Sequence, residues 1–411
     1  MGAPAEITGA YEPLSLGPLQ LRNRFIKSAT NEGMARGGVP SQALVNHHRR
    51  MAAGGAAMTT VAYCAVTADG RTFEDQICLD EATLPHLRAL TEAVHAEGGA
   101  ACAQITHGGC FTFLPELSTR YPLSASGGFN PPGVISGRFF KTAMTEDDME
   151  AVAEAFVTGA KRARVAGFDA VEIHMGHGYL LSQFLSPLYN RRKDRWGGDA
   201  AGRARYPAEV LKRVVAAVGD ELAVSCKISV VEGHKRGSSI EDVITTVRAL
   251  EAAGAHLVVL SGGMNVEAPW QIFGSNMPKA AVTQIQNGVV RTATKLMRLV
   301  EPKIEFRELY LRDYSLRIRE AVPELKLAYL GGAKSVDGVA QIMGDGFDAV
   351  VMGRALIHDP ALVNKFASGE LRVSGCTACN ECVVTMYGPG GTHCVLTESG
   401  DPEANARPAA G

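Results

Sequence analysis

The sequence predicts an α/β protein whose main body is a (β/α)8 TIM barrel. Short apolar runs alternate with helical segments eight times along the chain, which is the element order of that fold. The length of 411 residues suits such a barrel with insertions, and a hydrophobic content of 46% supplies a large core. We expect two parts, the barrel over residues 1–370 and a cysteine-rich extension packed on it over residues 371–411.

Each expected strand is a short run of apolar and β-branched residues that ends in glycine or polar residues. These runs cover residues 21–30, 57–66, 100–106, 169–173, 222–229, 256–261, 325–330 and 347–352. Periodicity and end signals predict helices over residues 41–53, 84–97, 145–166, 203–218, 241–254, 291–300 and 305–321. Thr145 and Asp148 form a capping-box pattern. Long loops without a clear period, 111–145 and 264–300, follow strands three and six.

The composition limits which kinds of partner and which cellular compartment we expect for this protein. The formal net charge of −2 gives no reason to propose nucleic acid or an anionic membrane as a partner. No apolar run is long enough to span a bilayer, and the first residues lack the pattern of a secretory signal. We therefore expect a cytoplasmic protein, in which the nine cysteines are free thiols or metal ligands.

A cluster of polar side chains follows the fourth expected strand. His174, His177 and Tyr179 lie within six residues, and the glycines between them allow a tight turn. The carboxyl ends of parallel strands carry the chemistry in barrel enzymes, so we expect these three side chains to converge on a site. Taken singly, the two histidines could be a metal pair or a structural pair, and the tyrosine a packed aromatic. The charged run 191–196 that follows favours the site.

Two further polar residues interrupt apolar strands. Gln104 lies in the third strand and Lys227 in the fifth, and both need partners if they are buried. For Lys227 the alternatives are a Schiff-base lysine or a side chain that reaches out at the rim.

Glycine turns follow the last two strands. Gly331 and Gly332 end strand seven, and Gly353 and Arg354 end strand eight. Bare backbone N–H groups at these two turns form the usual phosphate site of a barrel, and Arg354 adds a fixed charge.

Four cysteines near the end of the chain are spaced as metal ligands. They are Cys376, Cys379, Cys382 and Cys394. Three interpretations stay open for them: a [4Fe–4S] cluster, a structural zinc ion, or four reduced thiols.

The stretch after strand four resembles the signature of the Old Yellow Enzyme family of flavin-dependent oxidoreductases. His174, His177 and Tyr179 match its H-x-x-H/N-x-Y motif, and residues 183–198 match QFLSPxxNxRxDxxGG. The cysteines, with Asn380 between them, resemble the iron–sulfur branch of the family, which includes trimethylamine dehydrogenase and 2,4-dienoyl-CoA reductase. The resemblance covers about residues 12–396.

The resemblance implies FMN as the cofactor and assigns roles to individual residues. The two histidines hold a substrate carbonyl oxygen, and Tyr179 donates a proton to the substrate carbon. Gln104 and Lys227 face the flavin ring, and the two glycine turns with Arg354 hold its phosphate. The end of strand one and the end of strand two lie against the flavin, at Ala29, Thr30, Asn31, Ala62 and Tyr63.

The sequence departs from the family pattern at three positions. Ala29 replaces a proline, Asn31 stands where relatives have threonine or cysteine, and Cys110 replaces an arginine. The first two bear on how the flavin potential is tuned.

The expected activity is therefore that of an FMN-dependent NAD(P)H oxidoreductase. It reduces the activated C=C bond of a small enone-type substrate by hydride transfer from flavin N5 and protonation by Tyr179. One alternative is an iron–sulfur flavoprotein dehydrogenase that oxidises an amine or a saturated carbonyl compound. The other is a barrel lyase without flavin that uses Lys227. The sequence leaves NADH versus NADPH open, and also whether the chain forms a homo-oligomer.

Overall fold

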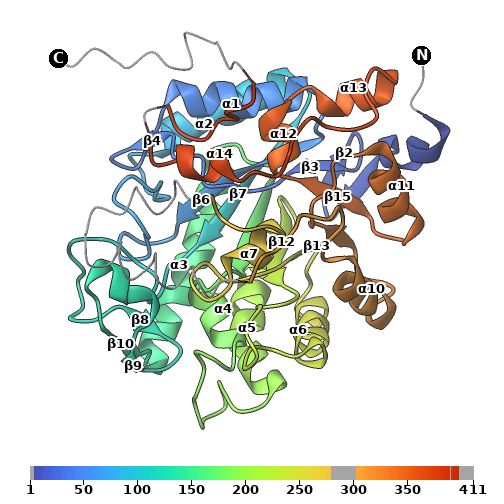
Figure 1. Ribbon diagram of the computed structural model, residues 1–411. Coiled ribbons are helices and arrows are strands. Elements are labelled where there is room, and N and C mark those ends of the chain that lie inside the picture. Colours follow the sequence, from blue (N-terminus) through green and yellow to red (C-terminus); the bar gives the residue numbers. More distant parts are fainter. Residues whose placement is uncertain (1–3, 279–301, 389, 398–411) are drawn as a thin grey trace.

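The protein forms a closed barrel of parallel strands in the order β11-β12-β13-β14-β15-β3-β6-β7 (Figure 1). This computed structural model describes residues 4–278, 302–388 and 390–397. Each strand pairs with its neighbour in the sequence, and β15 pairs with β3 to close the barrel. The strands are β3 (Phe25–Lys27), β6 (Met58–Ala65), β7 (Ala100–Thr106), β11 (Ala170–Met175), β12 (Ala223–Ser229), β13 (Leu257–Ser261), β14 (Leu327–Tyr329) and β15 (Ala349–Met352). The predicted (β/α)8 fold is confirmed.

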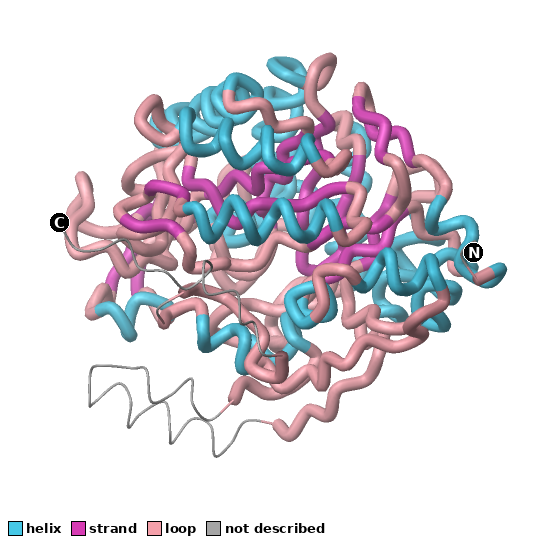
Figure 2. Tube along the Cα trace, turned by 90° about the horizontal axis from the view of Figure 1, so that it is seen from above, coloured by secondary structure: helices cyan, strands magenta, loops and turns pink. Residues whose placement is uncertain are grey.

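The helices lie around the barrel (Figure 2). The longer ones are α1 (Gln42–Ala53), α2 (Leu84–Ala96), α3 (Glu146–Val165), α5 (Ala200–Val218), α6 (Ile240–Ala252), α10 (Arg312–Ala321) and α11 (Val336–Gly344). Short helices are η1 (Ala5–Tyr11), η2 (Pro132–Ser136), α4 (Leu180–Leu185), α7 (Pro269–Phe273), α12 (Arg354–His358), α13 (Leu362–Ser368) and α14 (Glu381–Thr385). The capping box is confirmed, because the Thr145 side chain accepts from the Asp148 N–H and the Asp148 carboxylate accepts from the Thr145 N–H.

Two expectations about secondary structure need correction. The helix expected over 305–321 begins only at Arg312, because Leu309 has a φ of 57°, which a right-handed helix does not admit. The loop 111–145 contains a small sheet of β8 (Leu123–Ser124), β9 (Gly128–Phe129) and β10 (Phe140–Ala143). These strands are too short to show an alternation of apolar and polar residues in the sequence. The helix expected over 291–300 lies outside the described residues.

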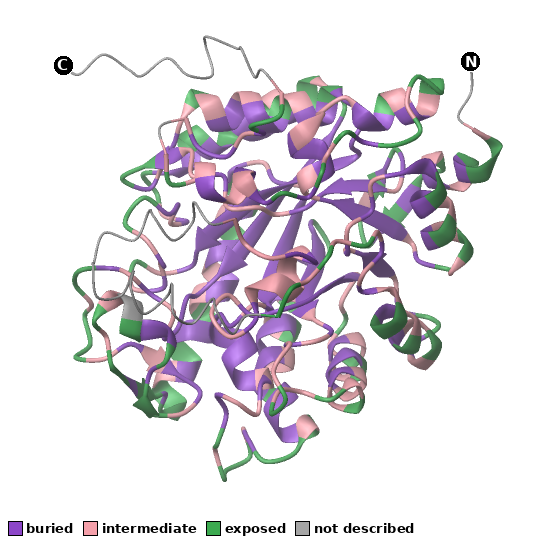
Figure 3. Cartoon of the chain, in the orientation of Figure 1, coloured by how far each residue is buried: buried purple, intermediate pink, exposed green. Residues whose placement is uncertain are grey.

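The barrel strands are buried on both faces, as the purple ribbons of Figure 3 show. Their outward side chains pack under the helices, whereas Ile26, Cys102, Val259 and Val351 belong to a separate cluster of inward-facing residues. Side chains alternate along a strand, so the next inward positions after Ile26 and Cys102 are Ser28 and Gln104. The barrel interior therefore changes from apolar to polar toward the carboxyl ends of its strands.

A hairpin of β1 (Leu14–Leu16) and β2 (Leu19–Leu21) closes the opposite end of the barrel. Leu14, Leu16 and Leu21 join the inward-facing apolar cluster. Among the described residues, no helix is both long and apolar enough to cross a bilayer.

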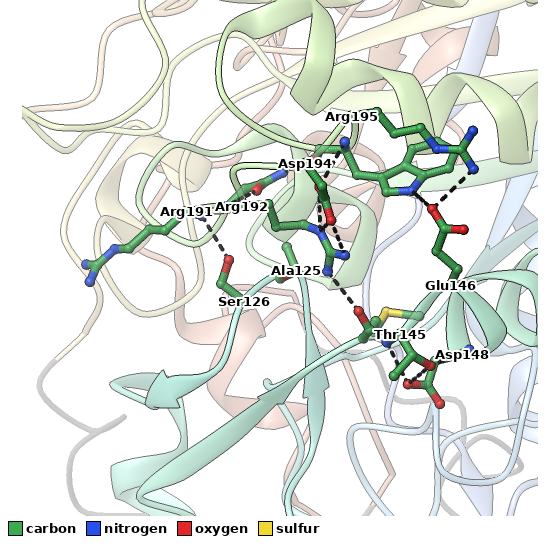
Figure 4. Close-up of polar contacts among 12 residues, drawn as sticks. Ala125, Ser126, Thr145, Glu146, Asp148, Arg191, Arg192, Asp194 and Arg195 are labelled. Carbon is green, nitrogen blue, oxygen red and sulfur yellow. Dashed lines mark hydrogen bonds and ion pairs between the residues drawn. The ribbon is translucent and has the colours of Figure 1, made fainter.

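The second half of the family motif is structural. Arg192 donates from Nη1 to the carbonyl oxygens of Ala125 (3.1 Å) and Met144 (2.8 Å), and from Nε to Asp194 (3.0 Å) (Figure 4). The Trp196 indole donates to Glu146 at 3.0 Å. These contacts pin the loop that follows β11 to the small sheet and to α3. None of the residues in the charged run 191–196 lines the cavity described next.

Candidate active site

A cavity of about 310 Å³ opens at the carboxyl ends of the barrel strands. It brings together fifteen of the eighteen predicted site residues. These are Ala29, Thr30, Asn31, Ala62, Tyr63, Gln104, His174, His177, Tyr179, Lys227, Gly332, Gly353, Arg354, Cys376 and Cys382. Gly331, Cys379 and Cys394 do not line it. Gly331 instead packs below the surface, where an added Cβ would lie 2.5 Å from the Tyr329 hydroxyl.

His174, His177 and Tyr179 converge at the end of β11. The His174 ring stands edge-on to the rings of His177 and Tyr179, with centroids 4.9 and 4.6 Å away. His177 has a φ of 61°, which a histidine adopts only where the surroundings hold it. Its backbone N–H donates to Ser229 Oγ at 3.0 Å, and its Nε2 lies 2.8 Å from Ser261 Oγ. Hydroxyls from β12 and β13 thus fix the second histidine.

Both imidazoles are neutral at physiological pH. Burial lowers the pKa of His177 to about 3, with a further contribution from the positive charge of Lys227. Burial, His177 and Lys227 lower the pKa of His174 well below its usual value. Because the His174 Nδ1 accepts from the Gly176 N–H at 3.2 Å, its ring proton is on Nε2. A neutral N–H donor can polarise a carbonyl oxygen without charging the empty pocket.

Tyr179 lies under aromatic side chains and is itself buried. Its ring centroid is 5.3 Å from that of Tyr63 and 5.8 Å from that of Phe111. Burial raises the pKa of Tyr179, while the polar side chains of Tyr63 and Asn265 act in the opposite sense. The phenol is therefore protonated at neutral pH and can serve as a proton donor.

A buried polar cluster forms the floor of the cavity. Lys227 Nζ lies 2.9 Å from Glu172 Oε1 and 3.4 Å from Ser28 Oγ, and Gln104 Nε2 donates to the same Glu172 oxygen at 2.7 Å. The Lys227 ammonium thus points into the barrel with a carboxylate partner, so the exposed-rim alternative is wrong. The sequence analysis missed Glu172, although a glutamate inside the apolar run 169–173 was the signal for it.

A second buried ion pair lies beside the cavity. Lys27 and Glu32 are in contact, and both side chains are almost fully buried. Glu32 also accepts from the Thr30 hydroxyl at 3.0 Å and from the Ala62 N–H at 3.2 Å. The pair therefore ties the loop after β3 to β6, which both supply walls of the cavity. The sequence analysis missed this pair as well.

The rim at β14 and β15 carries backbone turns and two cations. Gly332 has a φ of 85°, and Gly353 precedes the first residue of α12. The Arg354 guanidinium donates to the Phe273 carbonyl oxygen at 2.6 Å and to the Asn380 side chain. Lys334 Nζ donates to the Cys376 carbonyl oxygen at 3.2 Å. Half-buried backbone turns beside two positive charges fit a phosphate group. The Lys227 ammonium and the Gln104 amide on the floor fit the polar edge of a flavin ring.

The segment after α13, coloured red in Figure 1, supplies part of the cavity lining, including Cys376, Cys382 and Tyr387. Thr392 bonds to the carbonyl oxygens of Glu32 (2.7 Å) and Asn31 (2.8 Å) in the loop after β3. An added Cβ on Gly33 would lie 2.1 Å from the Met386 carbonyl oxygen, so only glycine permits this approach. The end of the chain thus forms one wall of the site.

The four cysteines lie along this segment. Cys382 and Cys394 are buried in one apolar cluster with Ile357, and Cys379 is exposed. Burial raises the pKa of Cys382 to about 12; Arg354 lowers it and the other three thiols raise it further. In the described part of the chain, no three His, Cys, Asp or Glu side chains are gathered closely enough to hold one metal ion.

Comparison with known proteins identifies the class. The model of the NADH:flavin oxidoreductase / NADH oxidase family matches residues 10–297. The chain therefore belongs to this family, and the resemblance to the Old Yellow Enzymes is confirmed. It is an FMN-dependent NADH:flavin oxidoreductase.

Individual relatives differ in length and in name. The 4,4'-dithiodibutanoate disulfide reductase of Rhodococcus erythropolis is 39% identical over 394 residues, covering 95% of each chain. The metal reductase of Desulforamulus reducens is 28% identical over 396 residues, but the chain spans only 54% of that protein's length.

The solved structures support the fold alone, because their sequence identities are low. The Old Yellow Enzyme homologue of Zymomonas mobilis aligns with a TM-score of 0.70 at 19% identity, covering 94% of this chain and 98% of that one. A 2-naphthoyl-CoA reductase aligns with a TM-score of 0.76 at 23% identity, covering 91% and 54%.

Proposed function

We propose that this enzyme reduces the activated C=C bond of an α,β-unsaturated carbonyl compound, with NAD(P)H as the reductant. One observation carries the proposal: two neutral histidines and a protonated tyrosine converge on a cavity whose floor holds Lys227 and Gln104. FMN, when bound, supplies the hydride chemistry. Its ring would be held by Lys227 and Gln104, and its phosphate by the turns at Gly332 and Gly353 with Arg354.

The residues of the chain then have distinct roles. His174 and His177 donate hydrogen bonds to the substrate carbonyl oxygen and stabilise the negative charge that develops there as the β-carbon is reduced. Tyr179 gives its proton to the α-carbon. Phe111 and Tyr63 flank Tyr179 and limit the water that reaches it.

A second candidate is the reduction of an organic disulfide. It is favoured by the 39% identity to a 4,4'-dithiodibutanoate disulfide reductase over nearly the whole length of both chains. In that reaction NAD(P)H gives two electrons to the disulfide bond, and two thiols form after uptake of a proton. The same cavity would have to accept a substrate with a carboxylate at each end.

An anaerobic acceptor assay separates the two candidates. FMN-loaded enzyme is mixed with NADH or NADPH and with 2-cyclohexen-1-one, 4,4'-dithiodibutanoate or no acceptor. We expect enone-dependent oxidation of the nucleotide with one saturated ketone formed for each nucleotide consumed. Formation of thiol from the disulfide, with no saturated ketone from the enone, would replace the first candidate by the second.

We further propose that the four cysteines, in an extension spanning residues 371–411, hold a [4Fe–4S] cluster. Cys376 and Cys382 line the flavin cavity, and Cys382 and Cys394 are buried together in one cluster with Ile357. A cluster spreads its ligands over several irons, so its cysteines need not surround a single ion. We expect about four irons per chain after anaerobic purification. An iron-free yellow protein would contradict this, whereas bound iron together with slow oxidation of NAD(P)H would favour the oxidative dehydrogenase alternative.

A further inference from the structure

A chain of buried hydrogen bonds leads away from the cavity at Tyr63. The Tyr63 hydroxyl lies 2.5 Å from Thr72 Oγ1, which lies 3.0 Å from Gln76 Oε1. Gln76 Nε2 donates to the Tyr63 carbonyl oxygen at 3.1 Å. Thr72 is fully buried, and Tyr63 and Gln76 are nearly so. The mechanism proposed above makes no use of Thr72 and Gln76.

The donor and the acceptor of each hydrogen bond in this series follow from the groups involved. A carbonyl oxygen only accepts, so the Gln76 group facing Tyr63 must be the amide nitrogen, and Oε1 must face Thr72. The Thr72 N–H and hydroxyl both donate to that oxygen. Since Thr72 has a single hydroxyl proton, the Tyr63 proton is directed at Thr72 Oγ1. In this structure, therefore, Tyr63 donates its hydroxyl proton to Thr72 and not to Tyr179.

Asn265, which also lines the cavity, supplies a second donor near Tyr179. Its backbone N–H donates to the His177 carbonyl oxygen at 3.1 Å, which places it beside the catalytic turn. Its side chain lines the cavity, and its amide nitrogen is buried without a hydrogen-bond partner among the described residues. A buried donor without a partner costs free energy, so a negatively charged oxygen is the group that would use it.

We propose that Tyr63 and Asn265 are positioning residues that stabilise the phenolate of Tyr179 after it has given up its proton. In that step the Tyr179 O–H bond breaks, a C–H bond forms at the substrate α-carbon, and the negative charge moves from the substrate oxygen to the Tyr179 oxygen. Tyr63 then turns its proton from Thr72 to this oxygen, and the Asn265 amide donates to it as well. A proton from water restores Tyr179 before the next cycle.

The surroundings of Tyr179 agree with this role. Tyr63 and Asn265 both act to lower its pKa, against the effect of burial. The other titratable side chains lining this part of the cavity are His174, His177, Lys227 and Tyr387. The two histidines are neutral, so neither supplies a full positive charge to the phenolate.

The experiment reads the ionisation of residue 179 directly. Tyr179 is replaced by a fluorinated tyrosine whose phenol ionises in the neutral range, and its absorbance is titrated. We expect Tyr63→Phe and Asn265→Leu each to raise the pKa of that phenol by about one to two pH units, since a hydrogen bond to a charged group contributes about 1.5–3 kcal/mol. Tyr206→Phe, which removes a buried hydroxyl bonded to the Met149 carbonyl oxygen, is the matched control and should leave the pKa unchanged.

A second arm uses the natural Tyr179. We expect Tyr63→Phe to slow enone reduction by pre-reduced enzyme about ten- to a hundredfold. This inference rests on the proposed function only in this arm. If the pKa of residue 179 stays constant in both variants, the inference is wrong whatever the substrate. If the pKa rises but the parent enzyme reduces no enone, the proposed function fails and the phenolate-stabilising role stands.

Discussion

Replacing Tyr179 by phenylalanine is expected to slow enone reduction by about 10²–10⁴-fold, the usual contribution of a general acid. The change removes only a hydroxyl, and the buried ring keeps its contacts with Tyr63 and Phe111. Hydride transfer to the substrate does not need this hydroxyl, but the proposed proton donor to the α-carbon is lost. The rate of substrate reduction is measured by mixing pre-reduced enzyme with the enone in a stopped-flow instrument.

The same variant contains its own control. Reduction of the flavin by NAD(P)H requires no proton from Tyr179, so its rate should equal that of the parent protein. An acceptor that needs no proton on carbon, such as a quinone, should also be reduced at the parent rate. Equal enone rates in the two proteins would show that Tyr179 is not the donor, and slow flavin reduction would show that the substitution disturbs the cofactor site.

Replacing Lys27 by methionine is expected to lower the free energy of unfolding by about 3–5 kcal/mol. Lys27 and Glu32 are almost completely removed from solvent, so the substitution leaves a buried carboxylate without its cation. The Thr30 hydroxyl and the Ala62 N–H still donate to Glu32, but neither carries a charge. Urea unfolding of the two proteins at neutral pH measures the difference.

Two further variants separate the causes of that loss. Lys365→Met removes a cation from a more exposed pair, 2.9 Å from Asp359, and should cost under about 1 kcal/mol. The double variant Lys27→Met with Glu32→Leu removes both charges and should recover much of the stability lost by Lys27→Met. If Lys27→Met is no more destabilising than Lys365→Met, the buried pair is not a determinant of stability.

Much of the fold could be predicted because its signals are local. Each barrel strand is an apolar, β-branched run bounded by glycine or polar residues, and helix ends such as that at Thr145 carry their own caps. His174, His177 and Tyr179 could be assigned to one site for the same reason, since a single tight turn positions all three. Their roles stay predictions until the variants are measured.

The residues that were missed depend on contacts between distant parts of the chain. Glu172 contacts Lys227 because β11 and β12 are paired in a register that sets His174 opposite Lys227. The sequence of either strand alone does not reveal this register. The proximity of Asn265 and Thr72 to the site could not be predicted, because both residues lie in loops that follow other strands. The start of α10 was misplaced because a positive φ at Leu309 is not signalled by a leucine.

The wall formed by the end of the chain has a consequence for conformational entropy. Thr392 and Asn31 are 361 residues apart in sequence, so their contact looks like the closure of a very long loop. In the folded barrel, however, β15 is already paired with β3, so the free length is only the stretch between α13 and Thr392. Loop-closure entropy grows only with the logarithm of length, about 0.6 kcal/mol for each doubling. Because the barrel is closed, the last part of the chain can contribute to the same site as the first part. The loss of conformational entropy is then only that of closing a short loop.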